Sequence, residues 1–160
     1  IIFFIYTMEI YVGSQHGNAT AISNELYCRL KDINENTNIH IFELNELEKR
    51  TIFNKPIIII CSTTGHAEVP DNGSKFWNKI KKRSLNKDSY KELKYLILGL
   101  GNTNYSEFCG AAKKISKRLK ELSAIQLHQL VTIDDEINDY DEKIDLFTEI
   151  ILQYFSIQND

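Results

Sequence analysis

The chain has 160 residues, of which 42% are hydrophobic and 26% charged, and this composition is typical of one globular domain rather than of a disordered or fibrous protein. The net charge of -3 at pH 7 argues against nucleic acid as the main partner. The 3 cysteines have no metal-ligand spacing, and their odd number does not suit a disulfide framework, so the sequence indicates a reducing, cytoplasmic setting.

The first residues of the chain, IIFFIYT, are apolar, but they are too few to span a bilayer and no basic stretch precedes them. We interpret residues 1–7 as a lead-in to the first strand. Because the chain does not begin with Met, the sequence leaves open a membrane anchor upstream of Ile1. In that case the alternative location is the cytosolic face of the endoplasmic reticulum.

Strand and helix patterns alternate along the chain. The predicted strands are residues 9–12, 38–44, 56–61, 95–99 and 125–131. The predicted helices are residues 19–31, 73–82, 110–122 and 141–155. Several strands, such as PIIIIC, are apolar throughout, which is typical of parallel strands buried on both faces. The sequence therefore predicts one α/β domain over residues 1–160, a doubly wound five-stranded parallel sheet with helices on both faces.

Ligands of such sheets bind beyond the carboxyl ends of the strands, so the loops there are the candidate sites. The first loop consists of Ser14, Gln15, His16, Gly17, Asn18 and Ala19. It would present backbone N–H groups at the positive end of a helix, which can hold a phosphate without Lys or Arg. The alternative is that Asn18 only caps the helix and Gly17 only turns the chain. Neither the dinucleotide glycine pattern nor the lysine of a P-loop is present.

The second loop follows the strand PIIIIC and begins with Ser62, Thr63, Thr64 and Gly65. Gly65 can adopt a positive φ, which would let its peptide turn toward a ligand. The alternative is an ordinary turn from strand to helix in which Asp71 caps the next helix.

The third loop includes Leu100, Gly101, Asn102, Thr103, Asn104, Tyr105, Phe108 and Cys109. A flat ring could stack on Tyr105, with backbone and amide groups of the loop bonding to its polar edges. A lone aromatic residue after a strand is usually a core residue, which is the alternative. The functional interpretation is favoured because all three loops follow parallel strands and so point to one end of the sheet.

Three segments, YVGSQHGNA, CSTTGHAEVPDN and LGLGNTNYSEFCGAAKKISKRLKELSA, resemble the flavodoxin-type FMN domain of the NADPH-dependent diflavin reductases. This family includes the microsomal cytochrome reductase, methionine synthase reductase, the sulfite reductase flavoprotein and the reductase that serves cytosolic iron-sulfur protein assembly. The resemblance covers residues 9–155 and implies a flavodoxin-like fold. It further implies that residues 14–19 bind the FMN phosphate and that residues 62–65 and 100–109 flank the flavin ring.

Within those segments, the resemblance implies that Tyr105 stacks on the ring and that the carbonyl of Gly65 accepts a hydrogen bond from the flavin N5–H. Asp135 falls where the family carries an acidic residue near the flavin, but the family's glycines are absent around it, and a solvated loop carboxylate is the alternative. Thr64 replaces the tyrosine of the microsomal reductase, so the inner stacking residue is missing. That departure points to the methionine synthase or iron-sulfur branch, and Phe76-Trp77 with residues 54–56 looks closest to the latter.

The function that the resemblance implies is one-electron transfer. The domain would take electrons from an FAD/NADPH-binding domain, in the same or a partner chain, and pass them singly to a haem or iron-sulfur acceptor protein. FAD and NADPH are expected only on a C-terminal part beyond residue 160, and no catalytic side chain and no metal are expected here. The alternatives are a free-standing flavodoxin carrier and a flavodoxin-like binding module without flavin.

Overall fold

The computed structural model describes residues 7–156, so the predicted lead-in lies outside the described residues except for Thr7, which begins β1. The strands are β1 (Thr7–Gly13), β2 (Asn38–Glu43), β3 (Ile57–Ser62), β4 (Lys94–Gly101), β5 (Ile125–Gln126) and β6 (Val131–Asp134). The helices are α1 (Asn18–Ile33), α2 (Ser74–Ile80), α3 (Gly110–Glu121) and α4 (Tyr140–Ser156), with 3-10 turns at Leu44–Lys49 and Asp71–Gly73. None of the described helices is long and apolar enough to cross a membrane.

The strands form one parallel sheet in the order β2-β1-β3-β4-β5, with β6 pairing to β4 beyond the end of β5. The predicted doubly wound parallel sheet of five strand positions is confirmed. The prediction of one continuous strand over residues 125–131 is wrong, because that position is shared by β5 and β6. Four residues separate Gln126 from Val131, whereas two separate their partners Tyr95 and Leu98, so the chain loops out between the two short strands.

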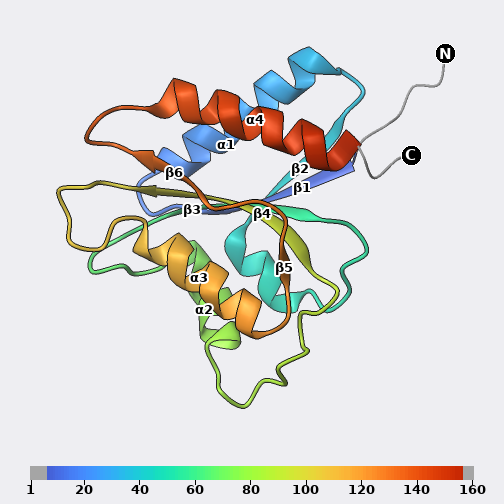
Figure 1. Ribbon diagram of the computed structural model, residues 1–160, viewed down its shortest axis with the longest axis vertical. Coiled ribbons are helices and arrows are strands. Elements are labelled where there is room, and N and C mark those ends of the chain that lie inside the picture. The colour runs from blue at the N-terminus through green and yellow to red at the C-terminus, as the bar shows by residue number, and fades with distance from the viewer. Residues whose placement is uncertain (1–6, 157–160) are drawn as a thin grey trace.

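Helices α1 and α4 cover one face of the sheet, and α2 and α3 cover the other (Figure 1). The strand residues alternate between the two cores that result. Ile58 and Ile60 pack under α1 and α4, whereas Ile57 and Ile59 pack with α2 and α3. All four are at most 1% exposed, which explains why β3 reads as a continuous apolar run.

Most predicted elements differ from the structure by one or two residues at their ends, and two of these differences have a clear cause. Leu44, predicted as the end of a strand, begins a 3-10 turn and is fully buried, because the chain turns there to pack against α2. The predicted helix over residues 73–82 is shorter, since a 3-10 turn occupies Asp71–Gly73 before α2 and the helix ends at Ile80.

The two-sided burial of β3 predicts a large difference between two isoleucines of the sheet. Ile58 is 0% exposed, whereas Ile41 on the edge strand β2 is 38% exposed. We expect Ile58→Ala to lower the free energy of unfolding by about 2–5 kcal/mol, because it leaves a cavity. Ile41→Ala is the matched control and should cost about 1 kcal/mol or less. Urea unfolding measures both, and equal losses would contradict this assignment of the core.

Candidate functional site

The carboxyl ends of β1, β3, β4 and β6 lie at one end of the sheet, at the left in Figure 1, where their loops enclose a cleft of about 410 Å³. The loops at this end are called the rim loops below: residues 13–18, 62–70, 101–109 and 134–139. The cleft is lined by His16, Asn18, Ser62, Thr63, Thr64, Gly65, Leu100, Gly101, Asn102, Tyr105, Glu107, Asp135 and Tyr140.

The first rim loop ends at the open N-terminus of the 16-residue helix α1. Gly17 is the N-cap, with a φ of 92°, and its N–H donates to the Oγ of Ser14 at 3.0 Å. The next three N–H groups, of Asn18, Ala19 and Thr20, have no intrahelical acceptor and donate to no other described residue. No acidic side chain lies in the first turn. The helix end therefore offers unpaired donors to an anion.

The alternative prediction, that Asn18 merely caps α1, is wrong because Asn18 is already the first helical residue and no side chain caps this helix.

The 3-10 turn at Asp71–Gly73, directly after the second rim loop, holds the first rim loop in place. Asn72 accepts a hydrogen bond from the N–H of Ser14 at 2.8 Å and donates to the carbonyl of Val12 at 3.2 Å. The side chain of Gln15 accepts from the N–H of Asp71 at 2.9 Å and donates to its carboxylate at 3.1 Å. Asp71 therefore pairs with Gln15, and the prediction that it caps a helix is wrong. Gln15, predicted as a phosphate-binding residue, directs its side chain to Asp71.

The second rim loop forms a tight turn closed by Thr64 and Glu68, which exchange backbone hydrogen bonds of 3.0 and 2.8 Å. Inside it, Gly65 has a φ of 47° and Ala67 a φ of 61°. The turn packs on the start of α3, where a Cβ on Gly110 would lie 2.3 Å from the Cβ of Ala67. A glycine is needed at that point, because any side chain would push the turn away from α3.

The third rim loop carries the exposed aromatic side chain of the cleft. Tyr105 is 70% exposed, and its N–H donates to the carbonyl of Asn102 at 3.0 Å. Behind it, Cys109 is fully buried, and a Cβ on Gly101 would lie 2.7 Å from the Cys109 nitrogen. Burial raises the pKa of the Cys109 thiol to about 12, so the thiol stays protonated at neutral pH and serves as a packing group.

The fourth rim loop is tied to the third through Asp134. Its two carboxylate oxygens accept from the N–H and the hydroxyl of Thr103 at 3.1 and 2.7 Å, and one also accepts from the Glu136 N–H at 3.0 Å. Burial alone raises the pKa of Asp134, but these hydrogen bonds outweigh it and hold the pKa below its usual value of 3.8. Asn104 donates to the carboxylate of Glu136 at 2.6 Å.

Asp135 lies in the cleft lining, where the Tyr140 hydroxyl donates to its carboxylate at 2.7 Å. The N–H of Asp135 donates to the carbonyl of Gly101 at 2.9 Å, which joins β6 and β4 at the rim. Burial and the bond to Asp135 raise the pKa of Tyr140 to about 12, so the phenol remains a donor at neutral pH.

Most of the predicted site residues lie in the lining of this cleft. The others flank it: Ser14, Gln15, Gly17, Ala19, Thr103, Asn104, Phe108 and Cys109. Two lining residues, Glu107 and Tyr140, were not predicted. Glu107 stands inside the third loop motif and could have been found there. Tyr140 begins the last helix, and no sequence signal connects it to the other loops.

The charged side chains that line the cleft are carboxylates, so its hydrogen-bond donors for an anion come mainly from the backbone. Its described lining contains Glu107 and Asp135 but no Lys or Arg, and His16 is the only other titratable side chain besides the two tyrosines. An anionic group can therefore be held here only by N–H groups and neutral side chains. Near the carboxylates, added negative charge on a bound group is disfavoured.

Comparison with known proteins identifies the fold and the family. Residues 10–147 match the sequence model of the family described as Flavodoxin. The chain belongs to the flavodoxin family. Its fold is similar to that of oxidised Flavodoxin 1 from Bacillus cereus, with a TM-score of 0.66 and 16% identity over 91% of this chain and 97% of that one.

Two groups of longer relatives are similar in sequence. Methionine synthase reductase of Caenorhabditis elegans is 31% identical over 92% of this chain, and NADPH-dependent diflavin oxidoreductase 1 of Xenopus laevis is 34% identical over 79% of it. This chain spans only about a fifth of either relative, 22% and 21%. The chain is thus a flavodoxin-like domain of the kind found in diflavin oxidoreductases, and the similar identities do not separate the two branches.

The family supports FMN as the cofactor of the domain. The cleft fits that group in two respects that the structure shows. One end has unpaired helix N–H groups with no acidic side chain in the first turn, which suits a phosphate. The lining also includes the exposed ring of Tyr105, which suits a flat aromatic system.

The two hydrogen bonds of Asn72 predict that it positions the first rim loop. We expect Asn72→Ala to lower the free energy of unfolding by about 1–3 kcal/mol and to speed exchange of the Ser14 amide, because both backbone partners lose their bond. Hydrogen exchange and urea unfolding test this. Asn86→Ala is the matched control, since Asn86 only caps an exposed turn at Asp88. An unchanged Ser14 exchange rate would contradict the role.

The lowered pKa of Asp134 predicts an acid dependence of stability. A carboxyl whose pKa is lowered by folding stabilises the protein above its unfolded pKa, and this contribution is lost as pH falls through the folded pKa. We expect Asp134→Asn to be less stable than the natural chain at neutral pH and to lose less stability as the pH falls below the usual carboxyl pKa of 3.8. If stability falls with pH in parallel for the two proteins, the ionisation of Asp134 contributes nothing to the acid dependence.

Proposed function

We propose that the cleft binds FMN with its phosphate at the first rim loop. The observation that carries the proposal is the juxtaposition of two features at one end of the sheet. Asn18, the first of the three residues with unpaired N–H groups at the start of α1, lines the cleft together with Tyr105. The side chains of Ser14 and Asn18 supply further hydrogen-bonding groups to the phosphate.

The flavin ring would lie between the second and third rim loops. Tyr105 stacks on one side of it, and the backbone of residues 62–65 forms the other side, where Thr64 provides no aromatic surface. The carbonyl of Gly65, at the turn with a φ of 47°, is the proposed acceptor for the flavin N5–H. Asp135 and Glu107 contribute negative charge to the same cleft, and Tyr140 keeps the carboxylate of Asp135 hydrogen-bonded.

We further propose that this domain is the electron-transfer domain of an NADPH-dependent diflavin reductase in the cytoplasm. FMN, when bound, supplies the one-electron chemistry, and the protein supplies binding, orientation and charge. Electrons would come from an FAD/NADP-binding domain and leave to a haem or iron-sulfur acceptor protein. The sequence similarity to two kinds of diflavin reductase over 79% and 92% of this chain supports this proposal.

A free-standing flavodoxin carrier is the second candidate. It is favoured by the structural match, which covers 97% of a bacterial flavodoxin and so requires no additional domain. The two candidates differ in the coding sequence beyond residue 160, where a diflavin reductase requires an FAD/NADPH-binding region. A flavin-free module is the third possibility, and it predicts a protein that stays colourless when FMN is supplied.

Titration with FMN and with riboflavin, which lacks the phosphate, tests the site. We expect quenching of flavin fluorescence by the natural chain. Gly17→Val should weaken FMN binding by about tenfold and leave riboflavin binding nearly unchanged, because it disturbs only the phosphate donors. Tyr105→Leu should weaken both ligands to a similar extent, since both carry the ring.

Undiminished fluorescence with the natural chain would overturn the proposal, and equal losses of FMN and riboflavin affinity in Gly17→Val would contradict the phosphate role. Circular dichroism of each variant tests whether the fold is retained.

A further inference from the structure

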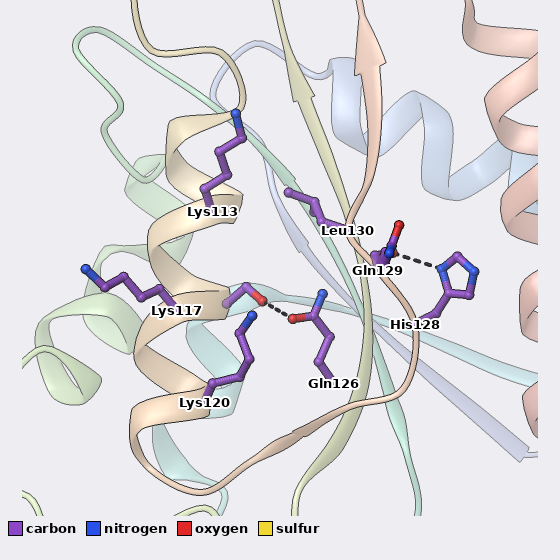
Figure 2. A pocket seen from close by; sticks show the side chains of 8 residues that line it. Lys113, Lys117, Lys120, Gln126, His128, Gln129 and Leu130 are labelled. Atoms are coloured by element: carbon purple, nitrogen blue, oxygen red, sulfur yellow. Dashed lines mark hydrogen bonds between the residues drawn. The ribbon is translucent and has the colours of Figure 1, made fainter.

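A second hollow of about 430 Å³ lies between α3 and the segment around β5, at the edge of the sheet (Figure 2). We call it the lysine groove. One wall is α3, which contributes Lys113, Lys117 and Lys120. The opposite wall comes from residues 126–130, with Gln126 and Leu130 facing the helix (Figure 2). None of these residues lines the FMN cleft, so the groove is separate from that site.

The three lysines form a row of unpaired positive charge. They are spaced by four and three residues, which places them on one face of α3 over about 10 Å of its axis. All three are exposed, and no carboxylate of the described residues forms an ion pair with them. The acidic neighbour on the helix, Glu121, pairs with Arg118 at 3.0 Å instead. No acidic residue lines the groove, although the whole chain carries a net charge of -3.

The wall opposite α3 presents an oriented donor. The Ser116 hydroxyl donates to the Oε1 of Gln126 at 2.7 Å, and the Tyr95 hydroxyl also reaches this oxygen at 3.5 Å. The carboxamide is therefore fixed through its oxygen, and its NH₂ donates to no described residue. Figure 2 shows the Gln126 side chain between the lysine row and the edge segment.

The backbone at the same place is an open sheet edge. β5 is the last strand of the sheet path and pairs only with β4. The N–H of Ile125 donates inward to the carbonyl of Leu93, just before β4, at 2.8 Å, and the N–H of Leu127 donates to the carbonyl of Tyr95 in β4 at 2.9 Å. By the alternation of a parallel ladder, the N–H and carbonyl of Gln126 point outward, and neither bonds to a described residue.

We propose that the lysine groove binds an extended acidic peptide segment, which adds to the open edge at β5 and directs carboxylates to the lysine row. Alternate side chains of an extended chain are about 7 Å apart and point to the same side, which is comparable to the axial rises of about 6 and about 4.5 Å between successive lysines of α3. A single small anion could contact only part of a row of that length. The free N–H and carbonyl of Gln126 supply the main-chain bonds that a strand addition requires.

The lysine groove adjoins the third rim loop at the start of α3. Lys113 lies in the first turn of α3, directly after the third rim loop, and its ammonium packs over the ring of Phe108 in that loop at 5.4 Å. An acidic segment seated along α3 therefore ends beside the loop that carries Tyr105. This inference does not depend on FMN binding, since its residues and its test are separate from the cleft.

A short synthetic peptide that alternates Glu and Thr, labelled for fluorescence anisotropy, tests the proposal on the whole chain. We expect saturable binding that weakens with salt and is lost when Gln replaces Glu in the peptide. Lys117→Glu combined with Lys120→Glu should raise the Kd by about tenfold or more. Lys55→Glu combined with Lys91→Glu makes the same charge change outside the groove and should leave the Kd within about twofold.

Two further arms separate strand addition from mere charge attraction. A peptide with N-methylated backbone amides at alternate positions keeps its carboxylates but cannot form the edge bonds, so it should bind about tenfold more weakly. A short single-stranded oligonucleotide supplies the same negative charge without a peptide backbone and should bind less tightly than the peptide. Absence of peptide binding, equal binding of the methylated peptide, equal effects of the two lysine pairs, or tighter oligonucleotide binding would each overturn the proposal.

Discussion

Burial of the central strands on both faces is the constraint on which the rest of this structure depends. β3 lies between two helical layers, and its residues from Ile57 to Cys61 are at most 1% exposed. No side chain within such a strand can reach solvent, and every peptide group is used by the ladder. Polar chemistry is therefore possible only where the strands end. Ser62 and Gly13 mark that boundary on neighbouring strands, which are paired in register at Gly13 and Cys61.

The rim loops are held by contacts with distant segments as well as by hydrogen bonds within each loop. Asn72 fixes the backbone on either side of Gly13, the Ala67 turn packs on Gly110, and Asp134 holds Thr103. Each tie joins segments that are tens of residues apart in the chain. Loops held in this way lose little further freedom when a ligand binds, so the order required for binding is already present in the folded chain. The cleft is thus built by the whole domain.

The cleft at the rim loops and the lysine groove would hold negative charge by different means. In the proposed FMN cleft the donors are backbone N–H groups at a helix end, and the described lining includes two carboxylates but no lysine or arginine. In the lysine groove the charge belongs to three long side chains on α3. Backbone donors are fixed in position and suit one compact phosphate, whereas mobile ammonium groups suit a spread of carboxylates and respond strongly to salt. α3 starts beside the first site and lines the second.

The sequence by itself determined the sheet class, the order of elements and which loops carry small and polar residues, because apolar runs and turn residues are local signals that burial of parallel strands reinforces. It also placed Tyr105 and Gly65 in the loops that line the cleft. Only the tertiary structure decided that Gln15 faces Asp71, that Gly17 rather than Asn18 is the N-cap, and that Tyr140 joins the lining. The break between β5 and β6, and with it the open edge beside the lysine row, likewise comes from pairing with β4. These outcomes depend on contacts between distant segments, for which no local pattern exists.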